Sequence, residues 1–187
     1  MSSASAISPF DPESENWWSR ESSKLAKRLC DFSLFVQRLR VQMRFGELTR
    51  APLQLVRFQI KESVAECDWL ARPCDPWDEG LQPEIGLRHA SLQALKDAVD
   101  VRSLLFYLMP DIDAAFFRIY RGKSAYVREA TYGRDLVIAG HVQRIAPAYR
   151  NVHSITMRAK LLGFRFSLQN EILGSMGEMT NIELVDW

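Results

Sequence analysis

Residues 55–70 read LVRFQIKESVAECDWL, and the order of apolar and polar side chains in this stretch decides the fold class. Apolar residues occupy every second position before the polar pair Glu62-Ser63. Behind that pair, Cys67 and Trp69 alternate with acidic residues. Period-two alternation is typical of a strand that buries one face and wets the other. The stretch therefore predicts an antiparallel hairpin of two half-buried strands.

The residues before this hairpin change from a helical to a strand-like period. Between about Trp18 and Gln37, apolar residues recur at spacings of three, four and seven, as on one face of an amphipathic helix: Leu25, Leu29, Phe32 and Val36. From Leu39 to Phe45 they alternate with polar residues, and three of the four polar residues from Arg38 to Arg44 are arginines. We expect this segment to be a strand with a cationic wet face, which would make the hairpin a three-stranded antiparallel meander.

The second half of the chain begins after a Pro-rich loop at 72–85. Ser91 is expected to cap a helix that ends before Pro110. Strand-like runs follow at 114–121, 125–130 and 136–145, a short helix at about 152–162 ending at Gly163, and a last strand at 164–168. The predicted class is α+β, with antiparallel β-meanders packed against two or three helices. Two similar α-β-β-β halves remain a hypothesis based on topology alone.

We predict a single domain over residues 17–168, flanked by a disordered tail at 1–16 and an acidic tail at 169–187. No apolar run approaches the roughly 20 residues that cross a bilayer. The N-terminus has no basic start or apolar segment of a secretory signal. We therefore expect a cytoplasmic protein, with no membrane partner and with its three cysteines reduced.

No motif in the sequence names a reaction. Gly122-Lys123-Ser124 resembles the end of a phosphate-binding loop, but Phe117 stands where such a loop has its first glycine, and the tripeptide joins two predicted strands. Cys67, Cys74 and His89 have the wrong spacing for zinc ligands. The sequence therefore predicts neither a metal site nor a cofactor.

Charge is segregated along the chain, although the net charge is only +1. The net charge is −3 over residues 1–19, +7 over 20–61, −7 over 62–113, +8 over 114–165 and −4 over 166–187. Aromatic residues are interleaved with the basic residues of the fourth block, as expected of a surface that contacts phosphates and stacks on bases. The competing interpretation is that the acidic third block neutralises the basic strands, within one chain or between two.

These observations give candidate site residues. The candidate anion-binding residues are Arg118, Arg121, Lys123, Arg128 and Arg144, and the candidate ligand-stacking residues are Tyr120 and Tyr126. A nucleic acid or other polyanion would require Arg118, Arg128 and Arg144 to face solvent together. His141 follows Gly140 on an apolar strand, where a glycine admits a ligand or another backbone.

Two classes of function follow. The first is a non-enzymatic binding or regulatory module, whose partner is another protein, a second copy of the chain, or a polyanion. The alternative is a small-molecule enzyme with a pocket around His141, Tyr120, Arg118 and Arg128. Trp17, Trp18 and Trp187 lie at the ends of the predicted domain, where they either close the core or form an exposed contact patch.

Deletion of residues 1 to about 15 should leave the melting temperature essentially unchanged, because this segment has no apolar periodicity and nothing to bury. Thermal unfolding followed by circular dichroism measures the effect. A large decrease in melting temperature would mean that Phe10 or its neighbours dock on the domain.

Overall fold

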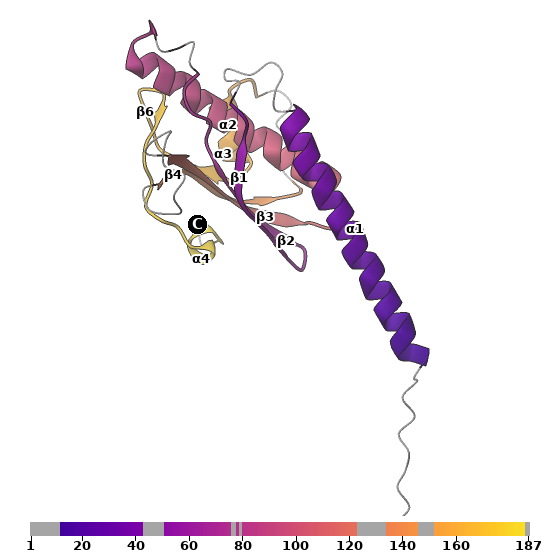
Figure 1. Cartoon of the computed structure of the whole chain (residues 1–187). Coiled ribbons are helices and arrows are strands. Elements are labelled where there is room, and N and C mark those ends of the chain that lie inside the picture. The colour runs from indigo at the N-terminus through magenta and orange to yellow at the C-terminus, as the bar shows by residue number, and fades with distance from the viewer. Residues whose placement is uncertain are drawn as a thin grey trace, which may run out of the picture.

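The computed structural model describes residues 12–42, 51–75, 78, 80–122, 134–145 and 152–185. Its elements in chain order are α1 (Pro12–Gln42), β1 (Gln54–Lys61), β2 (Val64–Leu70), α2 (Pro83–Leu108), β3 (Ala114–Gly122), β4 (Arg134–Gln143), α3 (Ile155–Leu161), β5 (Phe164–Arg165), β6 (Leu168–Gln169), β7 (Ile172–Leu173) and α4 (Asn181–Val185). The α+β prediction is confirmed (Figure 1).

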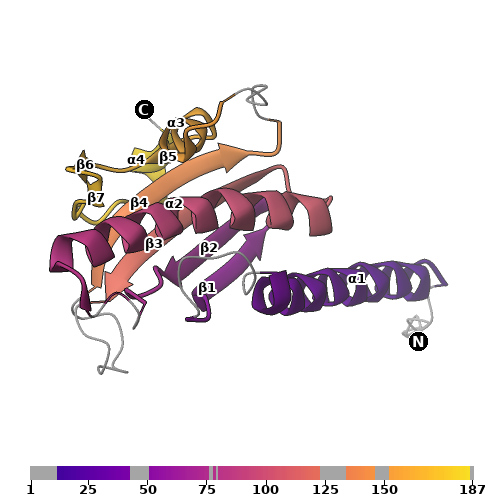
Figure 2. The same cartoon turned by 90° about the horizontal axis from the view of Figure 1, so that it is seen from above.

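The main sheet has the strand order β1-β2-β3-β4-β5. Three of its four pairings are antiparallel, whereas β2 and β3 are parallel and are connected through α2. A parallel pair needs a long crossover, and α2 provides it by lying across one face of the sheet (Figure 2). The sheet is therefore mixed, and not the purely antiparallel meander expected from the sequence.

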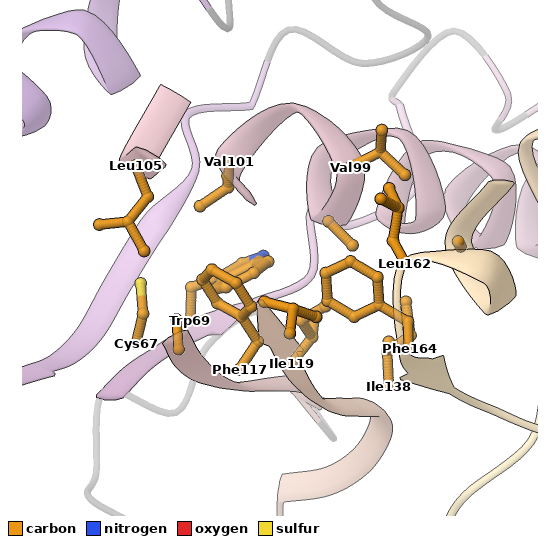
Figure 3. Close-up of a cluster of buried hydrophobic side chains, with 14 of the residues drawn as sticks. Cys67, Trp69, Val99, Val101, Leu105, Phe117, Ile119, Ile138, Leu162 and Phe164 are labelled. Atoms are coloured by element: carbon orange, nitrogen blue, oxygen red, sulfur yellow. The ribbon is translucent and has the colours of Figure 1, made fainter. Parts of the chain in front are cut away.

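The face of the sheet under α2 carries the core. Trp69 of β2 and Phe117 of β3 meet edge to face, with ring centroids 5.4 Å apart, and both side chains are fully buried. Helix residues such as Val99 and Leu105 complete the cluster (Figure 3). Cys67 lies in this core as a buried thiol, which confirms the prediction that Trp69 and Cys67 share the buried face.

Two polar contacts fix α2 on the sheet. Arg72, just beyond β2, and Asp97, in the middle of α2, form an ion pair of 3.0 Å with both side chains buried. At the C-terminal end of α2, the Arg144 guanidinium donates to the carbonyl oxygens of Phe106 and Met109, at 2.6 Å each. Removing either member of the Arg72–Asp97 pair would leave the other as an uncompensated buried charge, so this pair favours the observed position of α2.

The predicted strand at 39–45 is wrong as far as Gln42, because α1 continues to that residue. Leu39 is buried as a helical residue, one turn beyond Phe35, whose ring lies 5.5 Å from that of Phe58 in β1. The alternating pattern was compatible with a helix, since Phe35 and Leu39 are four residues apart. Residues 43–50 lie outside the described part of the chain.

Other boundaries also differ. Ser91 does not cap α2, which begins at Pro83 within the predicted loop, because proline suits the first helical turn. The buried Ser91 hydroxyl instead accepts a hydrogen bond of 3.0 Å from the Leu173 amide. Gly163 does end α3, with φ of +95°. Within the described residues each half begins with one helix followed by two strands, α1-β1-β2 and α2-β3-β4, and the predicted strand at 125–130 lies outside them.

The N-terminal boundary differs as well, since α1 already begins at Pro12. The predicted tail at 1–11 lies outside the described residues and stays a prediction. At the other end, the predicted acidic tail contains β7 and α4, and Leu184 of α4 is buried.

Gly140→Ala should lower the free energy of unfolding by about 1–3 kcal/mol, because a Cβ there would lie 2.8 Å from the Gly163 carbonyl oxygen. The glycine thus admits another backbone, one of the two alternatives that the sequence leaves open. Gly80→Ala is the matched control, since no other described residue beyond its chain neighbours has an atom within 4 Å of its Cβ position. Urea unfolding of the two variants measures the difference, and equal stabilities would contradict the close approach.

Candidate functional site

The sheet face opposite α2 gathers the polar residues of three strands. Strand alternation turns Glu66 and Asp68 of β2 to this face, together with Arg118 and Tyr120 of β3. His141 of β4 pairs with Phe116, and their rings stack with centroids 4.7 Å apart. Three of the four residues of the predicted enzymatic pocket, Arg118, Tyr120 and His141, therefore share one face.

Arg118 is the centre of a buried polar network on this face. Its guanidinium donates to the Asp68 carboxylate at 3.4 Å and to the Met179 carbonyl oxygen at 3.2 Å. A third donor contacts the side-chain oxygen of Asn181. The Arg118 side chain is only 9% exposed, so this cation is committed to groups of the chain itself.

Glu66 forms the second centre of the network. Its carboxylate accepts from Arg57 at 2.6 Å and from the Asn181 amide at 3.1 Å, and Lys61 lies 3.6 Å away. Asn181 thus joins Glu66 to Arg118. Because Glu66 and Asp68 belong to the acidic block 62–113, neutralisation within the chain holds for Arg118 and Arg57.

The C-terminal segment 174–185 covers the apolar part of the same face. Leu184 of α4 is buried against Leu136 and Ala139 of β4, and Met176 and Met179 pack on this cluster. The backbone of the segment is also held: the Met176 amide donates to the Leu136 carbonyl oxygen at 2.6 Å, and Arg165 donates to the carbonyl oxygens of Glu183 and Leu184.

A capping box begins α4. The Glu183 carboxylate accepts from the Thr180 amide at 2.6 Å, and the Glu183 amide donates to the Thr180 hydroxyl at 3.4 Å. The amide of Thr180 and then its hydroxyl, which donates to the same carboxylate at 2.8 Å, lower the pKa of Glu183. The segment that covers the sheet is therefore locally ordered as well as anchored to Arg118.

Burial shifts the pKa of three groups on this face toward their neutral forms. It raises the pKa of Asp68, against the opposing effect of Arg118 and Arg57. Burial also raises the pKa of Tyr120, with a contribution from Asp68. The pKa of His141 is lowered by burial and by the nearby Arg165. Each shift has an ordinary structural cause, and none sets up a nucleophile with an adjacent base.

The remaining predicted site residues are dispersed. Arg121 donates to the Leu173 carbonyl oxygen at 2.7 Å, and Arg144 is bound to the end of α2. Lys123, Tyr126 and Arg128 lie outside the described residues. Neither Arg118 nor Arg144 joins an exposed cationic stripe, so the condition set for polyanion binding is not met at these two positions.

The feature that sequence reasoning undervalued is the outer half of α1. From Trp17 to Cys30 every side chain is exposed except Glu21, which is half-buried. Trp18, Leu25 and Leu29 are 66%, 60% and 59% exposed. Figure 1 shows this half of α1 extending away from the sheet and its covering helices. The periodicity revealed the apolar stripe but not that the stripe has no domain beneath it.

No family model, curated protein or solved structure matches the chain. None of the helices over the described residues is long and apolar enough to cross a membrane. Within the same residues, His, Cys, Asp and Glu side chains form no group of three that would hold a metal ion.

Arg118→Met should lower the free energy of unfolding by about 3 kcal/mol at neutral pH, because the buried Asp68 carboxylate loses its cation. Without Arg118 the pKa of Asp68 rises further, so protonation relieves the variant more than the wild type. The deficit should therefore shrink as the pH is lowered from neutral into the acidic range.

Arg57→Met is the matched control, since the Arg57 side chain is 48% exposed and should contribute about 1 kcal/mol or less. Urea unfolding at neutral pH and at acidic pH compares the two variants with the wild type. Equal losses at Arg57 and Arg118, or a deficit independent of pH, would contradict the role given to the buried network.

Proposed function

We propose that this protein is a non-enzymatic binding module whose partner is a protein, and that the outer half of α1 is the binding element. The observation that carries the proposal is the exposed apolar stripe on this half. An isolated helix of this length is marginal in water, because most helical stability comes from packing an apolar face. Trp18, Leu25 and Leu29 have no such packing within the described chain.

The inner half of α1 is held firmly enough to present the outer half. Phe32 stacks on Phe58 of β1 with ring centroids 4.8 Å apart, and Phe35 is fully buried. Lys27 forms an ion pair of 3.0 Å with Asp111, and Arg28 donates to the Glu62 carbonyl oxygen. Among the described residues, the ion pairs and hydrogen bonds between α1 and the domain end at Lys27 and Arg28, beyond which the helix extends into solvent.

The enzymatic alternative receives less support from the second face of the sheet. Arg118 is bound by Asp68, Asn181 and a backbone carbonyl, and the segment 174–185 covers the neighbouring apolar surface. A substrate would have to displace this segment to reach Arg118. Exposed aromatic and aliphatic side chains on a projecting helix are, in contrast, typical of a surface that another protein covers.

A photo-crosslinking amino acid at Leu25 should capture a protein partner in the cells that express the chain, whereas the same residue at Tyr107 should not. Tyr107 is the matched control because it is 83% exposed but belongs to α2 and not to the stripe of α1. The captured protein should then bind the purified chain saturably, and Leu25→Asp should weaken that binding about tenfold or more. Equal or absent crosslinking at both positions would remove α1 as the binding element.

A further inference from the structure

We infer that the outer half of α1 binds the α1 helix of a second copy of this chain, in an antiparallel pair centred at position 27. The inference rests on the proposed function, since it assumes that α1 is the binding element, and it names the partner. In this register Leu25 of one copy lies opposite Leu29 of the other, and Trp18 lies opposite Val36.

The spacing of the apolar stripe points to self-pairing. Trp18, Leu25, Leu29 and Val36 fall on one side of the helix, because their spacings of seven, four and seven residues are close to whole numbers of turns. They are also symmetric about Lys27, at nine and two residues on either side. A two-fold interface requires this property: if position i meets position j, then j must meet i.

The charges of the helix favour the antiparallel direction. Residues 12–21 carry three acidic residues and one basic residue, whereas residues 33–42 carry two arginines and no acid. An antiparallel pair sets the acidic start of each helix sequence beside the basic end of the other. A parallel pair would set like charges together at both ends, which is unfavourable.

The inner half of α1 leaves room for the partner helix. Phe35 and Leu39, which are buried against the domain, lie about a quarter turn around the helix from the stripe, and Val36 of the stripe packs on the core but is only partly buried. On the stripe side, a groove of about 670 Å³ is bordered by Phe32, Ser33, Val36, Gln37 and Arg40 of α1. One helix can therefore contact its own domain and a second helix at once, and Trp18 of the partner would enter this groove beside Val36.

Light scattering of the purified chain at about 50 µM should give twice the monomer mass of 21.5 kDa. Leu25→Asp combined with Leu29→Asp should give a monomer, with a dissociation constant raised about a hundredfold or more. Leu34→Asp is the matched control: Leu34 is 43% exposed on the same helix but points away from the stripe, so this variant should remain dimeric.

Spin labels test the register. With Cys30 and Cys74 replaced by serine, single labels at Arg20 and Arg38 report the distance between equivalent positions of the two copies. An antiparallel pair centred at position 27 separates them along the axis by about 21 Å at position 20 and about 33 Å at position 38. The measured distance should therefore be about 10 Å longer at position 38, whereas a parallel pair would give equal distances.

The outcomes separate this inference from the proposed function. A monomer at about 50 µM, a dimer that survives both aspartates, or equal label distances would each overturn the antiparallel pair. If the purified chain is monomeric while Leu25 crosslinks to a different protein that binds saturably, the binding module stands and self-pairing falls. If Leu25 captures nothing and the chain is monomeric, both fall.

Discussion

The packing of α2 across one face of the sheet is the constraint on which the rest of this structure depends. Because β2 and β3 run parallel, the chain must cross from the end of one to the start of the other, and α2 makes that crossing over the core. The buried ion pair between Arg72 and Asp97 then fixes the helix at its middle. The sheet consequently has one face packed on the core under α2 and a second face that another part of the chain must cover.

The opposite face of the sheet has to be covered by a different part of the chain. This face is polar at β1 and β2 and largely apolar at β4, so neither a purely polar nor a purely apolar segment could cover all of it. The C-terminal segment solves this with a mixed surface: Leu184 and two methionines cover the apolar side, and Asn181 bridges Glu66 and Arg118 on the polar side. Charged residues that are distant in sequence thereby neutralise one another, and the basic appearance of residues 114–165 does not translate into a basic surface at Arg118.

Sequence patterns predicted individual helices and strands better than they predicted how these elements pair and pack. Alternation identified β1 and β2 correctly, and Gly163 and Gly140 were recognised as special positions, because these signals are local. The parallel pairing of β2 with β3 depends on the three-dimensional path of α2, which no local signal contains. The same limit applies to the site. Alternation over the predicted strand 114–121 sets Arg118 and Tyr120 on one face. No local pattern shows that the segment 174–185 covers the residues beside them.

The helix α1 is where local and tertiary requirements disagree. Its apolar residues form two sides, one ending in Phe35 and Leu39 against the domain and one running through Leu25 and Leu29 in solvent. A helix that served only its own domain would need the first side alone, and its outer turns would gain nothing from large apolar residues. The second side therefore has a physical reason only if it is covered by another surface. The stripe is symmetric in spacing about position 27, and the two ends of the α1 sequence carry opposite charge. A second copy of α1 can therefore cover the stripe and pair these charges at the same time.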